Sequence, residues 1–162
     1  METEENIVIV GAGIAGLATS LALHRLGLRS IVLESADSLR ATGFALALWT
    51  NAWRALDALD IGDSLRQRSL SITGFKSFSA ESGAPITEVS FVGNNSVEYE
   101  SRCVRRKDLL ETLANELPQG AIRYSSKVDS VEVSGPLKLV HLADGCTIRT
   151  KVNLSLIYQT CF

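Results

Sequence analysis

The sequence is poor in the residue types that metal centres and hydrolytic sites use. Its 162 residues include 3 cysteines and 2 histidines. The cysteines are odd in number and scattered, without C-x-x-C spacing or neighbouring histidines, which argues against a disulfide framework and against a metal site. No G-x-S-x-G elbow is present, so a hydrolase triad has little material. We therefore assign no metal ligands and expect free thiols at Cys103, Cys146 and Cys161.

The sequence also lacks a strong charge and a long apolar run. Its 16 basic and 18 acidic side chains leave a net charge of -2, which gives no strong field for nucleic acid or anionic membrane. The absence of a run of about 18 apolar residues excludes a transmembrane helix on length. The acidic opening Met1–Glu5 argues against a signal or transit peptide, so we expect a cytoplasmic protein. A hydrophobic content of 46% is ordinary for a globular domain.

The most informative pattern is a glycine-rich turn between an apolar strand and an apolar helix. The run Ile7–Val10 predicts a buried parallel strand, and glycines follow it with the spacing G-x-G-x-x-G. The first glycine permits a tight turn, the second lets a pyrophosphate approach the backbone, and the third lets the helix sit close to the sheet. Apolar residues recur at helical spacing from Ile14 to Leu26, and Gly27 predicts a C-terminal cap.

An acidic residue completes this pattern. Glu34 follows the apolar run Ile31–Leu33, eighteen residues after the last glycine of the motif. A carboxylate there can accept hydrogen bonds from a ribose diol, and the helix N-terminus favours phosphate. The pattern predicts that the chain binds the ADP half of a dinucleotide, and the alternative is a glycine-rich turn that binds nothing. The candidate residues are Gly11, Ala12, Gly13, Ile14, Ala15, Gly16 and Glu34.

The remaining chain alternates between helical and strand-like patterns. Apolar spacing predicts helices at about 50–59, 63–68 and 108–117, and a strand at 122–124. Short runs between 70 and 100, separated by Gly, Pro and Asn turns, indicate strands that leave the nucleotide fold. A meander of about three strands is predicted over 127–152, with Asp144-Gly145 as a type I′ hairpin turn. We expect Trp49 and Trp53 to serve packing rather than a substrate cage.

Three segments together resemble a known family. They are the strand–glycine–helix unit, the run Arg40–Leu46 with the helix that follows it, and the segment Arg102–Leu113, which carries R-x-x-x-R-x-x-L before a helix. Over about residues 6–152 the chain resembles the single-component FAD-dependent aromatic-ring hydroxylases, the group A flavin monooxygenases. More narrowly, it resembles the plant FAD-dependent monooxygenases that are similar to salicylate hydroxylase and zeaxanthin epoxidase. The arginine motif makes the resemblance more specific than the glycine loop alone.

The resemblance implies an α/β fold and FAD as the cofactor. The fold is a Rossmann-like, three-layer ββα FAD-binding fold with an inserted β-meander and an incomplete part of a β-rich substrate domain. Glu34, with Ser35 beside it, would hold the adenosine ribose, and Arg40, Arg102 and Arg106 would contact FAD. An arginine can donate several hydrogen bonds to phosphate, ribityl or flavin oxygens, and the alternative for each is a surface salt bridge or a helix-capping charge.

The resemblance also implies a reaction. In the family, transient NAD(P)H reduces FAD, and O2 is then used to hydroxylate or epoxidise an aromatic or isoprenoid-type small molecule. The cofactor carries this chemistry, and protein groups place the substrate and exclude water. We assign no catalytic residue, and the sequence specifies neither the substrate nor the oligomeric state.

The resemblance divides the chain into four segments and stops near its end. Residues 1–70 form a βαβ dinucleotide-binding core, 71–101 partial substrate-domain strands, 102–152 the return helix, strand and β-meander, and 153–162 a divergent tail. Members of the family are typically more than twice as long, and they carry G-x-D-G and a later G-D motif that this sequence lacks. We therefore expect a truncated splice product or gene model, with weak FAD binding, poor solubility and no turnover.

Two other functions remain open from the sequence. One is an NAD-dependent oxidoreductase domain with the same fingerprint, although the strand-rich segment after residue 70 and the arginine motif argue against it. The other is a non-catalytic nucleotide-binding or regulatory fragment. Yellow flavin bound to the purified protein would favour the monooxygenase. A colourless, folded protein that binds ADP-ribose compounds would favour the alternatives.

Overall fold

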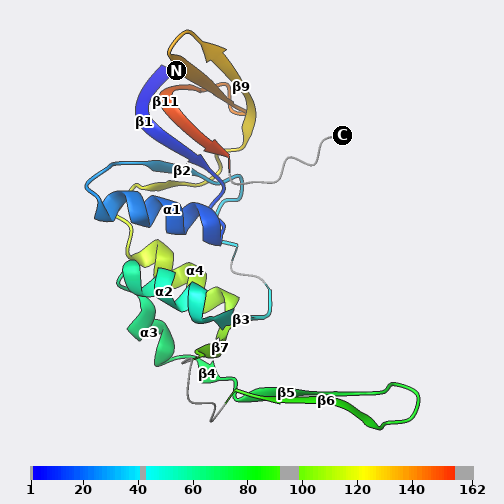
Figure 1. Ribbon diagram of the computed structural model, residues 1–162. Helices are drawn as coiled ribbons and strands as arrows, with labels where there is room; N and C mark the ends of the chain where they lie inside the picture. The colour runs from blue at the N-terminus through cyan, green and yellow to red at the C-terminus, as the bar shows by residue number, and fades with distance from the viewer. Residues whose placement is uncertain (1, 41–42, 92–98, 156–162) are drawn as a thin grey trace. The chain divides into compact units, whose positions relative to one another are not determined.

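The computed structural model describes residues 2–40, 43–91 and 99–155 (Figure 1). The chain divides into two compact units. The first comprises Met1–Thr42 and Leu109–Phe162, and the second comprises Gly43–Asp108. Among these described stretches, no helix is both long and apolar enough to cross a membrane. Cys103 and Cys146 are half-buried free thiols, as predicted, and Cys161 lies outside the described residues.

A six-stranded sheet forms the first unit, in the order β8-β2-β1-β11-β10-β9. Its parallel strands are β8 (Ile122–Arg123), β2 (Ile31–Leu33), β1 (Glu2–Val10) and β11 (Thr147–Ser155), and β10 (Leu137–Leu142) and β9 (Val128–Ser134) are antiparallel to their neighbours. This parallel β1-α1-β2 arrangement is the predicted Rossmann-like unit. A buried cluster of apolar side chains holds the sheet together: Val8, Leu33, Val140, Leu142 and Ile148.

Strand β11 takes part in two kinds of pairing. Its first residues, Thr147–Thr150, pair antiparallel with β10, and along Thr147–Ser155 it pairs parallel with β1. The last strand of the meander is therefore also the strand that re-enters the parallel sheet. The first residues of the segment that the sequence analysis assigned to a divergent tail continue this strand through Ser155, opposite Val10. The β-branched residues of β11 favour an extended backbone, which suits both partners. Strand β1 is nine residues long and can therefore pair with β11 over its full length.

Helix α1 (Ile14–Arg25) follows the glycine loop and ends as predicted. Gly27 has a φ of 76°, and the amides of Gly27 and Leu28 donate to the carbonyls of His24 and Leu23 at 3.0 and 2.9 Å. These two bonds form a Schellman motif, which favours glycine because the position is left-handed. The helix buries Leu17 and Leu21 almost completely. Each such burial stabilises the fold by about 1.5–3 kcal/mol relative to an exposed side chain.

The hairpin turn between β10 and β11 differs from the prediction. A type I′ turn needs positive φ at both central residues, but only Gly145 of the pair has it, at 83°. The amide of Gly145 donates to the Leu142 carbonyl at 3.0 Å, and the Leu142 amide donates to the Cys146 carbonyl at 2.9 Å. The connection is a three-residue loop with glycine in the bulge position. The Asp144 carboxylate accepts from the Cys146 amide at 2.8 Å and stabilises this longer loop.

The second unit combines a small sheet, two helices and a hairpin. The sheet has the order β3-β7-β4, formed by Ala45–Trp49, Ser101–Arg105 and Leu70–Ser71. Helices α2 (Thr50–Ala58) and α3 (Gly62–Arg66) lie close to the predicted helices, and β5 (Gly74–Phe78) and β6 (Pro85–Ser90) form a separate two-stranded hairpin. Trp53 is fully buried in packing, as expected, and Trp49 contacts Phe91 edge-on. Helix α4 (Arg106–Asn115) leads from this unit back into the first.

Candidate cofactor site

The turn from β1 into α1 depends on two of its glycines. Gly11 has a φ of 99°, which disfavours any residue with a Cβ, and its amide donates to the Leu33 carbonyl at 2.8 Å. A Cβ at Gly16 would overlap the carbonyl oxygen of Gly11. The loop and the first turn of α1 therefore pack backbone against backbone. The predicted roles of the first and third glycines in turn and close packing are seen here.

Gly13 lies at the helix N-terminus in open space. It is the N-cap residue of α1, with φ of -77° and ψ of 177°, and a Cβ added there would meet nothing within 4 Å. No side chain caps this end, and no acidic residue lies in the first turn. The amides of Ile14, Ala15 and Gly16 come before the first intrahelical bond, from Leu17 to Gly13 at 3.0 Å. Open space, amides and the helix dipole fit an anionic phosphate group.

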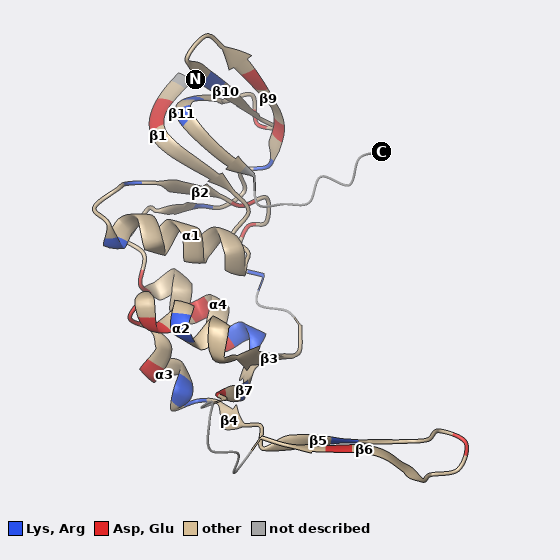
Figure 2. Ribbon diagram, viewed as in Figure 1, with Lys and Arg blue, Asp and Glu red and all other residues tan. Residues whose placement is uncertain are grey.

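The other charges on α1 leave this end unopposed. In Figure 2 the ribbon of α1 has the colour of a charged residue only at its C-terminal end, where Arg25 lies. Arg25 is held there by Glu116, at 2.7 Å between Nη2 and Oε2. The absence of an acidic residue in the first turn leaves the positive end of the dipole without an opposing charge from the helix itself, and Arg25 lies at the negative end.

Glu34 lies directly after β2 and is fixed by donors from two segments. Its Oε2 accepts from the Ala12 amide at 2.9 Å. Its Oε1 accepts from the Ala36 amide at 2.9 Å, from Arg40 Nη2 at 3.0 Å and from Ser35 Oγ at 3.2 Å. Burial alone would raise the pKa of Glu34, but these hydrogen bonds outweigh it, and the pKa lies below its ordinary value of 4.5. The residue is an ionised acceptor at the end of the glycine loop.

The structure thus brings together the predicted residues of the first unit. Ala12, Glu34, Ser35 and Arg40 form one hydrogen-bonded group beside the glycine loop, and the exposed Arg40 side chain also donates to Ser35 Oγ at 3.1 Å. Arg40 is therefore engaged in an ion pair, which is the alternative role that the sequence allowed. The carboxylate has about four lone-pair sites, and Oε2 uses one of its two. It can accept one further hydrogen bond from a ligand hydroxyl.

Arg102 and Arg106 belong to the second unit. Arg102 lies on the central strand β7, opposite Leu48 and Ser71, and its Nε donates to Glu100 Oε1 at 2.8 Å. Arg106 is the first residue of α4, and its amide donates to the Phe44 carbonyl at 3.0 Å. Its side chain runs past Gly43, where a Cβ would lie 3.1 Å from Arg106 Cδ. The motif spacing therefore places one arginine on a strand and the other at a helix start.

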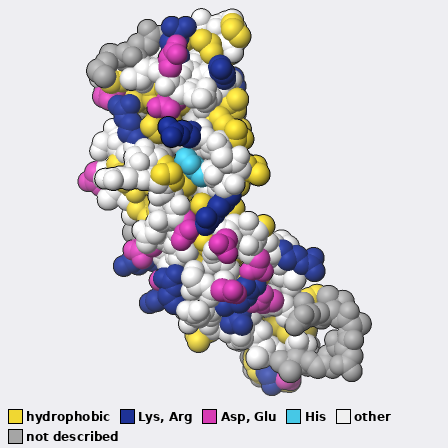
Figure 3. All heavy atoms as spheres, turned by 90° about the vertical axis from the view of Figure 1, so that its left-hand side faces the viewer, with side chains coloured by type: hydrophobic (Ala, Val, Ile, Leu, Met, Phe, Trp, Pro, Cys, Tyr) yellow, Lys and Arg dark blue, Asp and Glu magenta, His cyan; other side chains and the backbone are white. Residues whose placement is uncertain are grey.

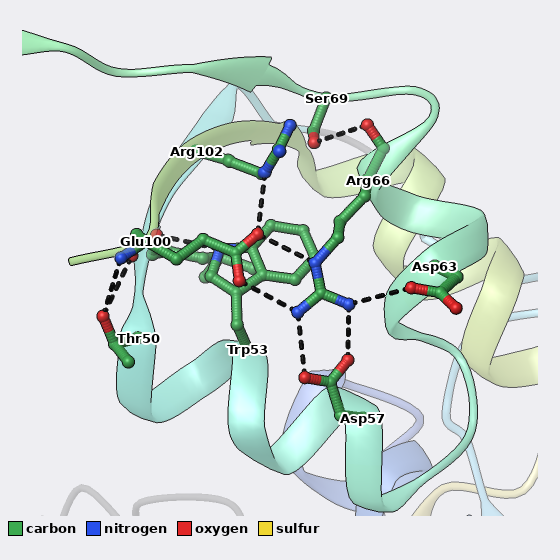
Figure 4. A network of polar contacts seen from close by, with 9 residues as sticks. Thr50, Trp53, Asp57, Asp63, Arg66, Ser69, Glu100 and Arg102 are labelled. Carbon is green, nitrogen blue, oxygen red and sulfur yellow. Dashed lines mark hydrogen bonds and ion pairs between the residues drawn. The ribbon is translucent and has the colours of Figure 1, made fainter. Parts of the chain in front are cut away.

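Sequence reasoning missed a charged network around Arg66 (Figure 4). The Arg66 guanidinium binds Asp57 through two bonds of 2.6 and 2.8 Å and Glu100 through two bonds of 2.8 and 2.9 Å. It also lies 5.0 Å from the Trp53 ring centroid and contacts Asp63 at 3.1 Å. The hydrogen bonds that Arg66 donates to Asp57 and Glu100 lower the pKa of both carboxylates, and the same bonds raise the pKa of Arg66. The i,i+3 spacing of Asp63 and Arg66 was the one local signal.

Sequence comparison finds relatives that cover part of this chain or nearly all of it. A family model described as "Lycopene cyclase protein" matches residues 6–155. "Monooxygenase 2" of Arabidopsis thaliana is 52% identical over 151 residues, and "FAD-dependent monooxygenase" of Gibberella moniliformis is 26% identical over 156 residues. They match 93% and 88% of this chain. "3-hydroxybenzoate 6-hydroxylase 1" of Aquipseudomonas alcaligenes is 51% identical over 67 residues, 41% of this chain. The chain belongs to the FAD-dependent monooxygenase family.

This chain is shorter than the family members it matches. Its matches cover 37% of the Arabidopsis protein, 35% of the Gibberella protein and, for the 67-residue match, 17% of the Aquipseudomonas hydroxylase. The match to the lycopene cyclase model includes the glycine loop and Glu34. A nucleotide-binding unit recurs in proteins of different chemistry, so that match supports the fold rather than a cyclase reaction.

The solved structures support the same fold. The crystal structure of p-nitrophenol 4-monooxygenase PnpA from Pseudomonas putida DLL-E4 matches with a TM-score of 0.83 and 23% sequence identity. The match covers 96% of this chain and 41% of that one. An α/β fold of this FAD-dependent monooxygenase type is therefore present, and the chain holds part of it.

Proposed function

We propose that this chain is the cofactor-binding part of an FAD-dependent monooxygenase that acts on a small molecule. The observation that carries the proposal is the group around Glu34: an ionised carboxylate that is tied to the Ala12 amide at the end of an open glycine loop. Family membership supports FAD as the cofactor. Hydroxylation of an aromatic compound is supported by the names of the relatives, and NAD(P)H is the proposed transient reductant.

The residues of the first unit fit the ADP half of FAD. We assign the pyrophosphate to the loop at Gly11 and Gly13 and to the amides of Ile14, Ala15 and Gly16. A phosphate there would meet backbone donors at the positive end of α1. The adenosine ribose is assigned to Glu34, whose Oε2 has one acceptor site left beside the Ala12 amide. Ser35 and Arg40 adjoin this carboxylate, and Arg40 is the proposed contact at the same end of FAD.

In the second unit, Arg102 and Arg106 are the proposed further contacts to FAD. The support is the motif R-x-x-x-R-x-x-L and the ability of a guanidinium to donate several hydrogen bonds to phosphate or flavin oxygens. Bound FAD would supply the redox chemistry of hydroxylation. The residues of this chain would bind and orient the cofactor, and no group is assigned to proton transfer or to the substrate.

FAD titration of the 162-residue protein tests the proposal. We expect saturable quenching of flavin fluorescence, competed by ADP-ribose. Glu34→Gln should weaken FAD binding roughly 10- to 100-fold, because a hydrogen bond to a charged group contributes about 1.5–3 kcal/mol. Glu88→Gln, on the exposed hairpin strand β6, is the matched control and should bind as the wild type does.

The outcome separates the candidate functions. A folded protein that does not bind FAD would contradict the proposal. Binding of NAD+ with no binding of FAD would favour the NAD-dependent oxidoreductase. FAD binding that is indifferent to Glu34→Gln would move the ribose site away from the glycine loop. Circular dichroism of each variant shows whether it is folded before binding is compared.

A further inference from the structure

We propose that Glu100 is a positioning residue that holds the Arg102 side chain ready for FAD, with Arg66 as its anchor. The proposal rests on the proposed function, because it takes Arg102 as an FAD contact. It goes beyond that function in assigning a role to Glu100 and Arg66, which carry no motif. We call the chain of contacts from Arg66 through Glu100 to Arg102 the relay. It lies within the second unit and is drawn in Figure 4.

The Arg102 guanidinium is held at one nitrogen and left open at the others. Nε donates to Glu100 Oε1 at 2.8 Å, and among the residues described in the structure this is its only side-chain or backbone hydrogen bond. Four N–H groups on the two terminal nitrogens therefore stay available to a ligand. The backbone of Arg102 is fixed because β7 is the central strand, with β3 on one side and β4 on the other.

Glu100 is itself immobilised from two directions. Its two carboxylate oxygens accept from Arg66 Nε at 2.8 Å and Arg66 Nη2 at 2.9 Å, the bidentate geometry that gives direction as well as energy. Its amide donates to Thr50 Oγ1 at 2.9 Å, at the first residue of α2. The carboxylate therefore presents Oε1 to Arg102 in a single orientation.

Arg66 connects this carboxylate to the core of the unit. Its guanidinium lies over Trp53, which is 1% exposed and donates from Nε1 to the Leu48 carbonyl at 3.2 Å. Asp57 binds the other side of the guanidinium through both oxygens. A rigid aromatic ring and a second carboxylate thus fix Arg66. These contacts restrict the orientation of the Arg102 side chain, which is long and would otherwise rotate freely.

The relay offers an anionic ligand directed donors rather than an excess of positive charge. Arg66 lies between Glu100 and Asp57, with Asp63 beside it, so the carboxylates balance the two arginines, and the terminal nitrogens of Arg102 are the donors that remain. Hydrogen bonding to Arg66 and Arg102 lowers the pKa of Glu100, so the carboxylate stays ionised in neutral solution. Pre-ordering Arg102 would reduce the conformational entropy that this long side chain loses when a ligand binds.

A double-mutant cycle in FAD affinity tests the relay. The 162-residue protein is compared with Glu100→Gln, Arg102→Ala and the variant that carries both changes. We expect Glu100→Gln to weaken FAD binding roughly 3- to 10-fold, the fold-change that corresponds to the ordering cost of one long side chain. In the Arg102→Ala background the same change should have no effect. Glu88→Gln, which removes an exposed charge from the same unit, should leave the affinity unchanged.

Several results would overturn the proposal. Additive losses in the double variant, or wild-type affinity in Glu100→Gln, would show that Glu100 does not act through Arg102. A lower melting temperature of Glu100→Gln with unchanged affinity of the folded protein would indicate a purely structural role. If Glu100→Gln does not fold, Arg66→Lys replaces it, because lysine keeps the charge but loses the bidentate geometry. It should weaken FAD binding in the same Arg102-dependent way, and wild-type affinity would overturn the relay.

Failure of the proposed function is distinguishable from failure of the relay. A folded wild-type protein that does not bind FAD overturns both. A wild type that binds FAD and loses affinity in Glu34→Gln, but not in Arg102→Ala, keeps the proposed function and overturns the role of Arg102 and of its relay.

Discussion

Gly13 and Gly16 occur in the same motif for different physical reasons. At Gly13 the missing Cβ leaves open space beside the helix N-terminus, and its backbone angles suit other residues as well. At Gly16 the missing Cβ allows contact with the Gly11 carbonyl. Gly13 therefore affects what can approach the loop, and Gly16 affects whether the loop can form.

Alanine at these two positions should separate binding from stability. Gly13→Ala should change the free energy of unfolding by no more than about 0.5 kcal/mol, because nothing lies within 4 Å, but should weaken FAD binding by filling the phosphate approach. Gly16→Ala should lower the free energy of unfolding by about 1–3 kcal/mol, because backbone must shift. Urea unfolding and FAD titration of both variants are the measurements. Equal losses of stability would contradict this separation.

At the scale of elements, local patterns were enough for α1 and its neighbours. The glycine spacing, the apolar stripe and Gly27 each act within a few residues, and the structure confirms the helix and its Schellman cap. The turn type predicted at Asp144-Gly145 was wrong, because the hydrogen bond between the Asp144 carboxylate and the Cys146 amide favours a longer loop. The double pairing of β11 depends on β1, far away in sequence, so no local pattern predicts it.

The candidate site was predictable to the same extent. Glu34 could be placed from its spacing to the glycines, because both lie in one βαβ unit. The contact of Glu34 with Ala12 follows from that unit, but the three hydrogen bonds to its other oxygen, from Arg40, Ser35 and Ala36, do not. Arg66 and Glu100 lie 34 positions apart and meet because β7 places Glu100 near α3. Composition and periodicity give no information on such a pairing.

The pairing of Arg66 with Asp57 and Glu100 should make the stability of the second unit sensitive to acid. Asp57 and Glu100 have lowered pKa values in the folded chain, so their pairing with Arg66 stabilises the fold above the ordinary values of 3.8 and 4.5. This stability is lost as the pH falls through the folded-state pKa values, because the unfolded chain binds protons first. Urea unfolding at pH 7 and at about pH 3 measures the loss.

Asp57→Asn identifies the source of this acid sensitivity. At pH 7 the substitution should lower the free energy of unfolding by about 1 kcal/mol, less than a charged hydrogen bond usually contributes, because the Asp57 side chain is 47% exposed. The difference from the wild type should shrink at low pH. Glu88→Gln breaks the exposed pair with Lys76 and should cost almost nothing at either pH. An unchanged pH dependence in Asp57→Asn would contradict the assignment.

At the scale of the whole molecule, apolar side chains are left on the surface. Figure 3 shows hydrophobic side chains among the charged ones on one face. In the second unit Phe44 is 93% exposed, Leu70 76%, Ile86 67% and Phe78 57%. Isolated exposed apolar residues are common, but several on one small unit favour association. The chain spans 37% of its Arabidopsis relative and therefore contains only part of the fold of FAD-dependent monooxygenases.

The hairpin β5–β6 is the element that should drive self-association. In the described part of the chain its two strands form a sheet of their own, so each has an unpaired edge, and such hairpins are only marginally stable alone. Phe78 and Ile86 add exposed apolar surface on the two strands.

Sedimentation velocity between low and high micromolar protein should show concentration-dependent association. The double change Phe78→Ser and Ile86→Thr should reduce it and leave the Glu34-dependent binding of FAD unchanged. Val133→Ser, at a still more exposed apolar position on β9, is the control, and an equal reduction there would show that association depends on total apolar surface rather than on the hairpin.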